Sequence, residues 1–236
     1  MIPLTAAPSP LWYVDRATGA VTMLLLTASV VIGMGTTVRW RSPVWPRYIS
    51  STLHRNVSVM ILVLLGAHVA TSVLDPFAKL GLRDALVPFG SWYRPLWLGL
   101  GVVAAELVVA LAVSSAVRRF IGYRVWRVLH WAAYAVWPVA LVHGLGTGDD
   151  VRATWFLGLQ AACVVAFWLA LSLWRLPFGW PRLVWPRLLT AALSSVTVVA
   201  LVVWLLNGPL APGWARVAGT PLPLLEAAHG SPSPNP

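Results

Sequence analysis

The chain has 236 residues, of which 58% are hydrophobic and 10% are charged, and its formal net charge is +10. Soluble domains carry about 25% charged residues, so this composition excludes an ordinary soluble domain and indicates a membrane protein. The basic residues cluster in short segments between apolar runs and do not cover a soluble face, which argues against a nucleic-acid-binding surface.

Six apolar runs are long enough to cross a bilayer as helices, which takes about 20 residues. In chain order they lie near residues 20–38, 53–74, 93–116, 126–145, 153–174 and 188–206. We therefore predict an all-α fold, a polytopic bundle of six transmembrane helices spanning residues 20–206. Residues 1–19 form an expected N-terminal segment outside the membrane. Residues 207–236 are rich in proline and small residues, and we expect a disordered tail.

Arginines mark one side of this bundle. They cluster in the first, third and fifth loops, at Arg39, Arg41, Arg47, Arg55, Arg118, Arg119, Arg124, Arg127, Arg175, Arg182 and Arg187. The fourth loop, with Asp149 and Asp150, is net acidic. By the positive-inside rule the three basic loops face the cytoplasm, so both termini lie outside the plasma membrane. No basic region precedes the first apolar run, so we expect a retained helix and not a cleaved signal peptide.

Four of the five histidines lie in two of the predicted helices. His54 and His68 are 14 residues apart in the second helix, and His130 and His143 are 13 apart in the fourth. Both helices run outward from the cytoplasm, so His54 and His130 share an inner level and His68 and His143 an outer one. At 1.5 Å per residue the levels are about 20 Å apart.

The 14-residue and 13-residue spacings differ in whether they place both histidines on one face of their helix. Fourteen residues make about four helical turns, which brings His54 and His68 to one face. Thirteen residues leave His143 well rotated from His130 in an ideal helix. A kink at Pro138, which lies between them, would change this phase.

Paired imidazoles at two membrane depths point to haem. A lone membrane histidine usually forms a helix–helix hydrogen bond, whereas a haem iron with histidine on both axial positions passes single electrons. Cys163 is the single cysteine, which excludes an internal disulfide, a CxxCH haem attachment and an iron–sulfur site. We therefore predict that the four histidines ligate two b-type haems.

The motif H-R-x12-H (His54, Arg55, His68) is followed by W-x3-H-x12-H (Trp126, His130, His143). Over about residues 17–175 this pattern resembles the ferric-reductase-like transmembrane domain of ferric reductases, NADPH oxidases and the haem subunit of periplasmic methionine sulfoxide reductase. The resemblance implies an inner haem on His54 and His130 and an outer haem on His68 and His143.

The resemblance also implies redox partners. No G-x-G-x-x-G motif follows a predicted strand, so the chain lacks a recognisable NADPH or FAD domain of its own. We expect a separate electron donor, either a cytoplasmic flavoprotein or a membrane quinol. The expected acceptor is ferric iron or a partner redox protein outside the membrane. The chain is then an oxidoreductase component, with no substrate pocket predicted in it.

Four further residues have open roles. Arg55, Arg124 and Arg127 lie near the inner histidines and either bind haem propionates or serve only as topology signals. Glu106, an acid in mid-helix, is either functional or neutral and hydrogen-bonded. A transporter or channel that passes protons or metal through its histidines and Glu106 is the alternative function, and a haem-free scaffold protein is a third.

Overall fold

The computed structural model describes residues 9–37, 46–76, 79–174 and 185–229, and these residues are predominantly helical. Arg39, Arg41, Arg175, Arg182 and the last seven residues, 230–236, lie outside this part. The elements in chain order are α1 (Pro10–Thr37), α2 (Arg47–Leu74), α3 (Leu82–Leu86), α4 (Pro95–Ala116), α5 (Arg118–Ile121), α6 (Tyr123–His130), α7 (Ala133–Thr147), the 3-10 helix η1 (Asp149–Arg152), α8 (Thr154–Trp174), α9 (Trp185–Asn207), α10 (Trp214–Val217) and α11 (Leu222–His229).

Within the described residues, five helical stretches have the length and composition of membrane spans. They are Pro10–Thr36, Tyr48–Leu74, Pro95–Ala116, Tyr123–Thr147 and Thr154–Ser172. The sixth long helix, α9, has a shorter apolar stretch at Ala192–Asn207. The predicted all-helical, polytopic membrane fold is confirmed.

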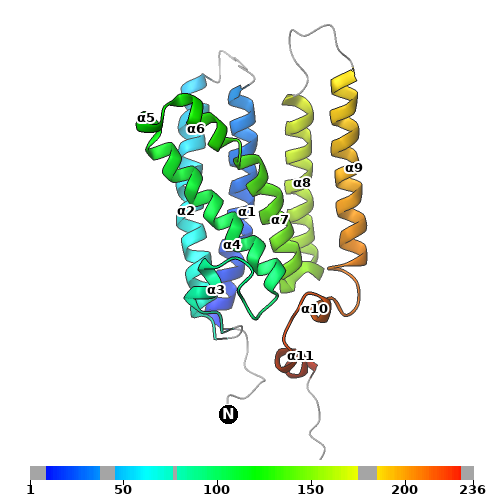
Figure 1. Cartoon of the computed structure of the whole chain (residues 1–236). Helices are drawn as coiled ribbons and strands as arrows, with labels where there is room; N and C mark the ends of the chain where they lie inside the picture. Colours follow the sequence, from blue (N-terminus) through cyan, green and yellow to red (C-terminus); the bar gives the residue numbers. More distant parts are fainter. Residues whose placement is uncertain (1–8, 38–45, 77–78, 175–184, 230–236) are drawn as a thin grey trace, which may run out of the picture.

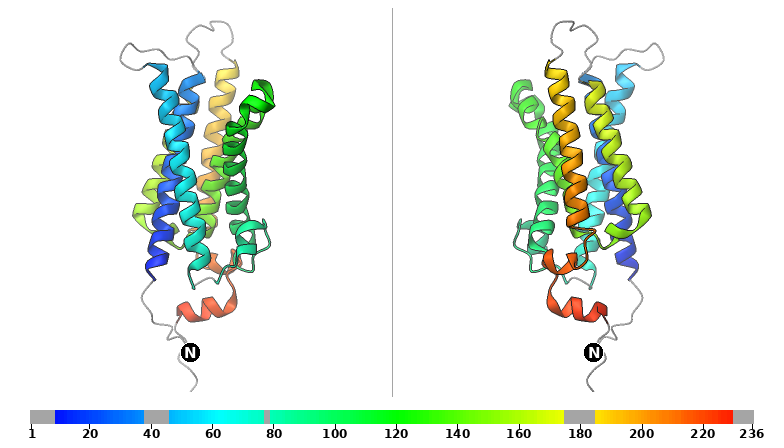
Figure 2. Two further views of the ribbon diagram at one scale, coloured as in Figure 1. Left: turned by 90° about the vertical axis from the view of Figure 1, so that its left-hand side faces the viewer. Right: turned by 90° about the vertical axis from the view of Figure 1, so that its right-hand side faces the viewer.

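The long helices stand roughly parallel or antiparallel in a bundle (Figure 1). α1 packs along α2, α7 and α8, while α4 packs on α6 and α7. α9 stands at the edge of the bundle beside α8 and has few contacts with it (Figure 2). The hydrophobic core joins α1, α7 and α8 around buried Met34, Val136 and Cys163.

The two ends of the bundle differ in their aspartates: one end carries them together with basic residues such as Arg16, Arg83 and Arg152, and the other carries arginines without aspartate. All five aspartates of the chain lie at the end where α1 begins and α2 and α7 finish, which we call the acidic end. α10 and α11 also lie there (Figure 1). The opposite end, where α2 begins and α5 and α6 lie, carries the exposed arginines Arg55, Arg118, Arg119, Arg124 and Arg127. We call this the basic end.

Three boundaries differ from the sequence prediction. α1 begins at Pro10 and not near Ala20, because proline suits the first turn of a helix and the Ser9 hydroxyl accepts the Trp12 N–H at 3.1 Å. α2 begins at Arg47, several residues before the apolar run at 53–74. Residues 208–229, where the composition predicts disorder, contain the short helices α10 and α11.

Candidate haem-binding site

The four membrane histidines meet in two pairs. At the basic end the rings of His54 (α2) and His130 (α6) have centroids 6.2 Å apart, and we call them the basic-end pair. At the acidic end His68 (α2) and His143 (α7) have ring centroids 6.5 Å apart and form the acidic-end pair. Metal–imidazole bonds are about 2 Å long, so two imidazoles on opposite sides of one metal ion have centroids roughly 6 Å apart. Both separations suit this arrangement.

A break between α6 and α7 reduces the phase difference that the 13-residue spacing leaves. The sequence places a kink at Pro138, but the helix is interrupted earlier, at Trp131 and Ala132. Backbone bonds to the third preceding residue close this segment, from the N–H groups of Trp131, Ala132, Tyr134 and Ala135 to the carbonyls of Val128, Leu129, Trp131 and Ala132. Such 3-10 turns rotate by about 120° per residue, against about 100° in an α-helix. The added rotation turns His143 toward the side that His130 faces.

Hydrogen bonds fix three of the four imidazole rings. The Nδ1 atom of His54 lies 3.0 Å from the Ser29 carbonyl oxygen, that of His68 lies 3.0 Å from the Asp15 carbonyl oxygen, and that of His143 lies 2.8 Å from the Trp97 carbonyl oxygen. A carbonyl only accepts, so Nδ1 carries the proton and donates it. The lone pair of each ring is then on Nε2, the atom that can bind a metal.

Three glycines make room for these same rings. A Cβ on Gly101 would lie 2.5 Å from the Nδ1 of His143, one on Gly19 would lie 3.0 Å from the Cε1 of His68, and one on Gly33 would lie 3.3 Å from the Cε1 of His54. The close approach of ring and helix therefore needs glycine, most strictly at Gly101.

The glycines and the carbonyl acceptors follow one rule. Each acceptor residue, Asp15, Ser29 or Trp97, lies four positions before the glycine that faces the same histidine. The motifs in the sequence did not indicate these residues. One signal was present, since Gly19 and Gly33 repeat in α1 the 14-residue spacing of His54 and His68 in α2.

His130 is held differently. Its Nδ1 is buried without a hydrogen-bond partner, and its ring stacks on Trp126, one turn earlier, at a centroid distance of 4.8 Å and an interplanar angle of 26°. Trp126 in turn donates its indole N–H to the Ser115 hydroxyl at 3.2 Å. At this position the aromatic ring of the W-x3-H motif orients the imidazole in place of a backbone carbonyl.

A cavity of about 270 Å³ lies between the helices on the acidic side, lined by His68, His143, Gly19 and Gly101 among others. One water molecule needs only about 15 Å³, so the space suits a large ligand. Its wall includes two buried polar atoms without partners, the Thr22 hydroxyl and the Gln160 side-chain oxygen. Buried polar atoms are normally hydrogen-bonded, so the wall fits a bound group that carries both apolar and polar atoms.

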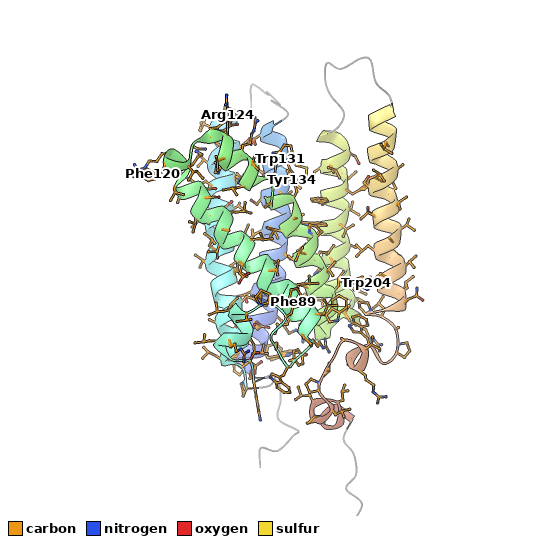
Figure 3. All side chains as sticks on the ribbon, viewed as in Figure 1. Phe89, Phe120, Arg124, Trp131, Tyr134 and Trp204 are labelled. Carbon is orange, nitrogen blue, oxygen red and sulfur yellow. The ribbon has the colours of Figure 1, made fainter. Side chains whose placement is uncertain are left out.

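The predicted propionate contacts lie at the basic end. Arg55, Arg124 and Arg127 are exposed, and the guanidinium of Arg127 lies 5.7 Å from the ring centroid of Tyr123. Figure 3 shows Arg124 at this end of the bundle, beyond Trp131 and Tyr134 near the junction of α6 and α7. In the structure these arginines line the exterior, and the propionate role stays a prediction.

Glu106 lies apart from the cavity that the acidic-end histidines line. Glu106 is exposed on α4 and is not among the residues that line the cavity. Within the described ranges, no three His, Cys, Asp or Glu side chains come together to hold a bare metal ion. The site thus offers pairs of imidazoles, which suit a metal whose remaining ligands come from a macrocycle.

Comparison with protein families supports this reading of the site. Residues 16–141 match the family model of the ferric reductase like transmembrane component, a stretch that covers more than half of the chain. It ends before the expected limit at residue 175; it contains His54, His68 and His130, and His143 lies just beyond it. Searches of curated proteins and of solved structures found no significant match. On the strength of the family match, the chain belongs to the ferric reductase-like transmembrane components.

Proposed function

We propose that this protein is a di-haem b-type membrane cytochrome that carries electrons across the membrane. Membership of the ferric reductase-like family implies haem-based electron transfer across a membrane. The observation that carries the di-haem proposal is the pairing of imidazoles at 6.2 and 6.5 Å, each pair at its own depth in the bundle. Haem, when bound, supplies an iron that accepts and releases one electron at a time.

Each proposed haem is assigned its own pair of histidines. His54 and His130 would ligate the basic-end haem, and His68 and His143 the acidic-end haem. Carbonyl acceptors on α1 and α4 keep three of the imidazoles in the tautomer that leaves Nε2 free. With two imidazoles holding each group, a bound haem would offer no open iron site for oxygen chemistry and would supply one-electron transfer.

The clustering of arginines without aspartates at the basic end supports a direction. Under the positive-inside rule the basic end faces the cytoplasm, which places both termini outside. A separate donor, a cytoplasmic flavoprotein or a membrane quinol, then delivers electrons near His54 and His130. The acceptor, ferric iron or a partner redox protein, receives them at the acidic end. The cytochrome serves as the oxidoreductase component that connects the two.

The transporter alternative has less support. It requires polar groups along an internal path, and Glu106, its main intramembrane acid, is exposed on the outside of α4. Passage of protons or metal ions also does not explain why the four histidine rings lie in two pairs with similar centroid distances.

The test is a reduced-minus-oxidised absorption spectrum of the detergent-purified protein, with haem quantified against protein. We expect a low-spin b-type spectrum and two haems per chain. His68→Ala and His143→Ala should each remove the acidic-end haem alone, and His54→Ala and His130→Ala the other. His229→Ala, which changes the fifth histidine in α11, is the matched control and should keep both. Protein from haem-supplied cells that contains no haem would overturn the proposal and favour the transporter.

A further inference from the structure

The two histidines of α2 differ in the charge of their hydrogen-bond partner. The Nδ1 of His68 lies 2.9 Å from a carboxylate oxygen of Asp15, in addition to the Asp15 carbonyl at 3.0 Å. The Nδ1 of His54 faces only neutral groups, the Ser29 carbonyl at 3.0 Å and the Ser29 hydroxyl at 3.3 Å. One proposed haem ligand is thus paired with an anion and its counterpart is not.

A second donor shares this carboxylate with His68, and the neighbouring cation is engaged elsewhere. The Ser72 hydroxyl, one turn after His68 on α2, donates to the same Asp15 oxygen at 2.5 Å. The nearest cation in sequence, Arg16, forms an ion pair with Asp150 and lies over the Trp12 ring at 3.7 Å. Asp15 and His68 have exposed side-chain fractions of 26% and 24%, so the pair is largely shielded from water. Contact with water and salt would weaken the attraction between the two groups.

A ligating histidine that donates to a carboxylate becomes a more basic ligand, and the negative charge nearby favours the ferric over the ferrous state. Resting on the proposed function, we propose that Asp15 is a positioning residue that lowers the midpoint potential of the acidic-end haem below that of the basic-end haem. Asp15 acts through His68 and does not itself contact the iron.

This order of potentials has a consequence for the acceptor. An electron that moves from the basic to the acidic end passes to the site of lower potential, and the membrane potential, negative on the cytoplasmic side, supplies driving force for that movement. The acidic-end site can then reduce acceptors of low potential that the basic-end site alone would leave oxidised.

The experiment is a spectroscopic redox titration of the purified haem-loaded protein and its variants. His54→Ala and His68→Ala proteins assign each potential to its end. Asp15→Asn should raise the acidic-end midpoint potential, changing the ratio of oxidised to reduced haem at fixed ambient potential about tenfold, or ~59 mV for one electron. The basic-end potential should not move.

Two further variants separate the hydrogen bond from general charge and from misfolding. Ser72→Ala removes a donor that competes for the Asp15 oxygen, so the bond to His68 strengthens and the acidic-end potential should fall. Asp75→Asn deletes a carboxylate in the wall of the same cavity that bonds to the Ser9 hydroxyl and not to His68, and it should shift the potential much less.

Equal shifts in Asp15→Asn and Asp75→Asn, or no shift in Asp15→Asn, would overturn the proposal. If Asp15→Asn loses the acidic-end haem, the sign of the shift in Ser72→Ala decides, and a rise or no change contradicts the role of Asp15. Unmoved potentials in a protein that holds two haems refute this inference alone, whereas absence of haem refutes the proposed function itself.

Discussion

The two histidine pairs have nearly the same ring geometry but are built by different means. Their centroid distances are 6.2 and 6.5 Å and their interplanar angles 76° and 75°. At the acidic end both imidazoles donate to backbone carbonyls and line one cavity. At the basic end one imidazole has a carbonyl acceptor, and the other relies on stacking with Trp126. Similar ligand geometry therefore does not require similar supporting contacts.

The largest expected effect comes from closing the space beside the acidic-end pair. Gly101→Ala places a Cβ 2.5 Å from the His143 Nδ1, which is too close for contact, so the ring must leave its position. We expect the haem content to fall from two per chain to one, with the basic-end haem retained. Retention of both haems with unchanged spectra would show that the close approach of Gly101 to the His143 ring is not needed for haem binding.

The second effect tests the stacking that replaces a carbonyl at the basic end. Trp126→Leu removes an aromatic pair worth about 0.5–1.5 kcal/mol, so the basic-end haem should dissociate up to about tenfold more readily. The measurement is the rate of haem transfer to excess apomyoglobin. Trp131→Leu is the control, because that side chain is 70% exposed and makes no stacking contact with His130 that the structure records. Equal rates in both variants would contradict an orienting role for Trp126.

The third effect concerns the exposed arginines of the basic end. Replacing Arg55, Arg124 and Arg127 by Gln should slow reduction by an acidic flavoprotein donor several-fold at low ionic strength, and the difference should vanish at high salt. We expect unchanged haem content, since all three side chains are exposed. A fall in the basic-end midpoint potential would instead identify them as propionate ligands.

The smallest effect distinguishes the glycines from one another. Gly33→Ala brings a Cβ to 3.3 Å from the His54 Cε1, which a shift of a few tenths of an ångström relieves. The loss of haem affinity should stay below the tenfold to hundredfold range that is typical when a residue orienting a metal ligand is changed. Gly19→Ala, at 3.0 Å from His68, should lie between Gly33→Ala and Gly101→Ala. Haem retention on dilution measures the series, and any other order would contradict the steric account.

The sequence by itself determined the membrane class, the long helices and the pairing of histidines by depth. These features follow from local composition and from a rise of about 1.5 Å per residue, which need no knowledge of neighbouring helices. The expected pairs, His54 with His130 and His68 with His143, are those whose rings lie together. The histidine spacing also carried the family resemblance, and the match over residues 16–141 confirms it.

Only the tertiary structure decided how the rings are held. The tightened turn at Trp131 and Ala132, which the sequence did not indicate, contributes to the phase of His143. Asp15 reads in sequence as part of a segment before the membrane, yet α1 begins at Pro10 and brings its carboxylate to His68. The glycines and carbonyl acceptors lie on other helices than the histidines that they contact, and the contacting residues can be as distant in the chain as Asp15 and His68. Such contacts depend on the register of packed helices, which the periodicity of a single helix does not contain.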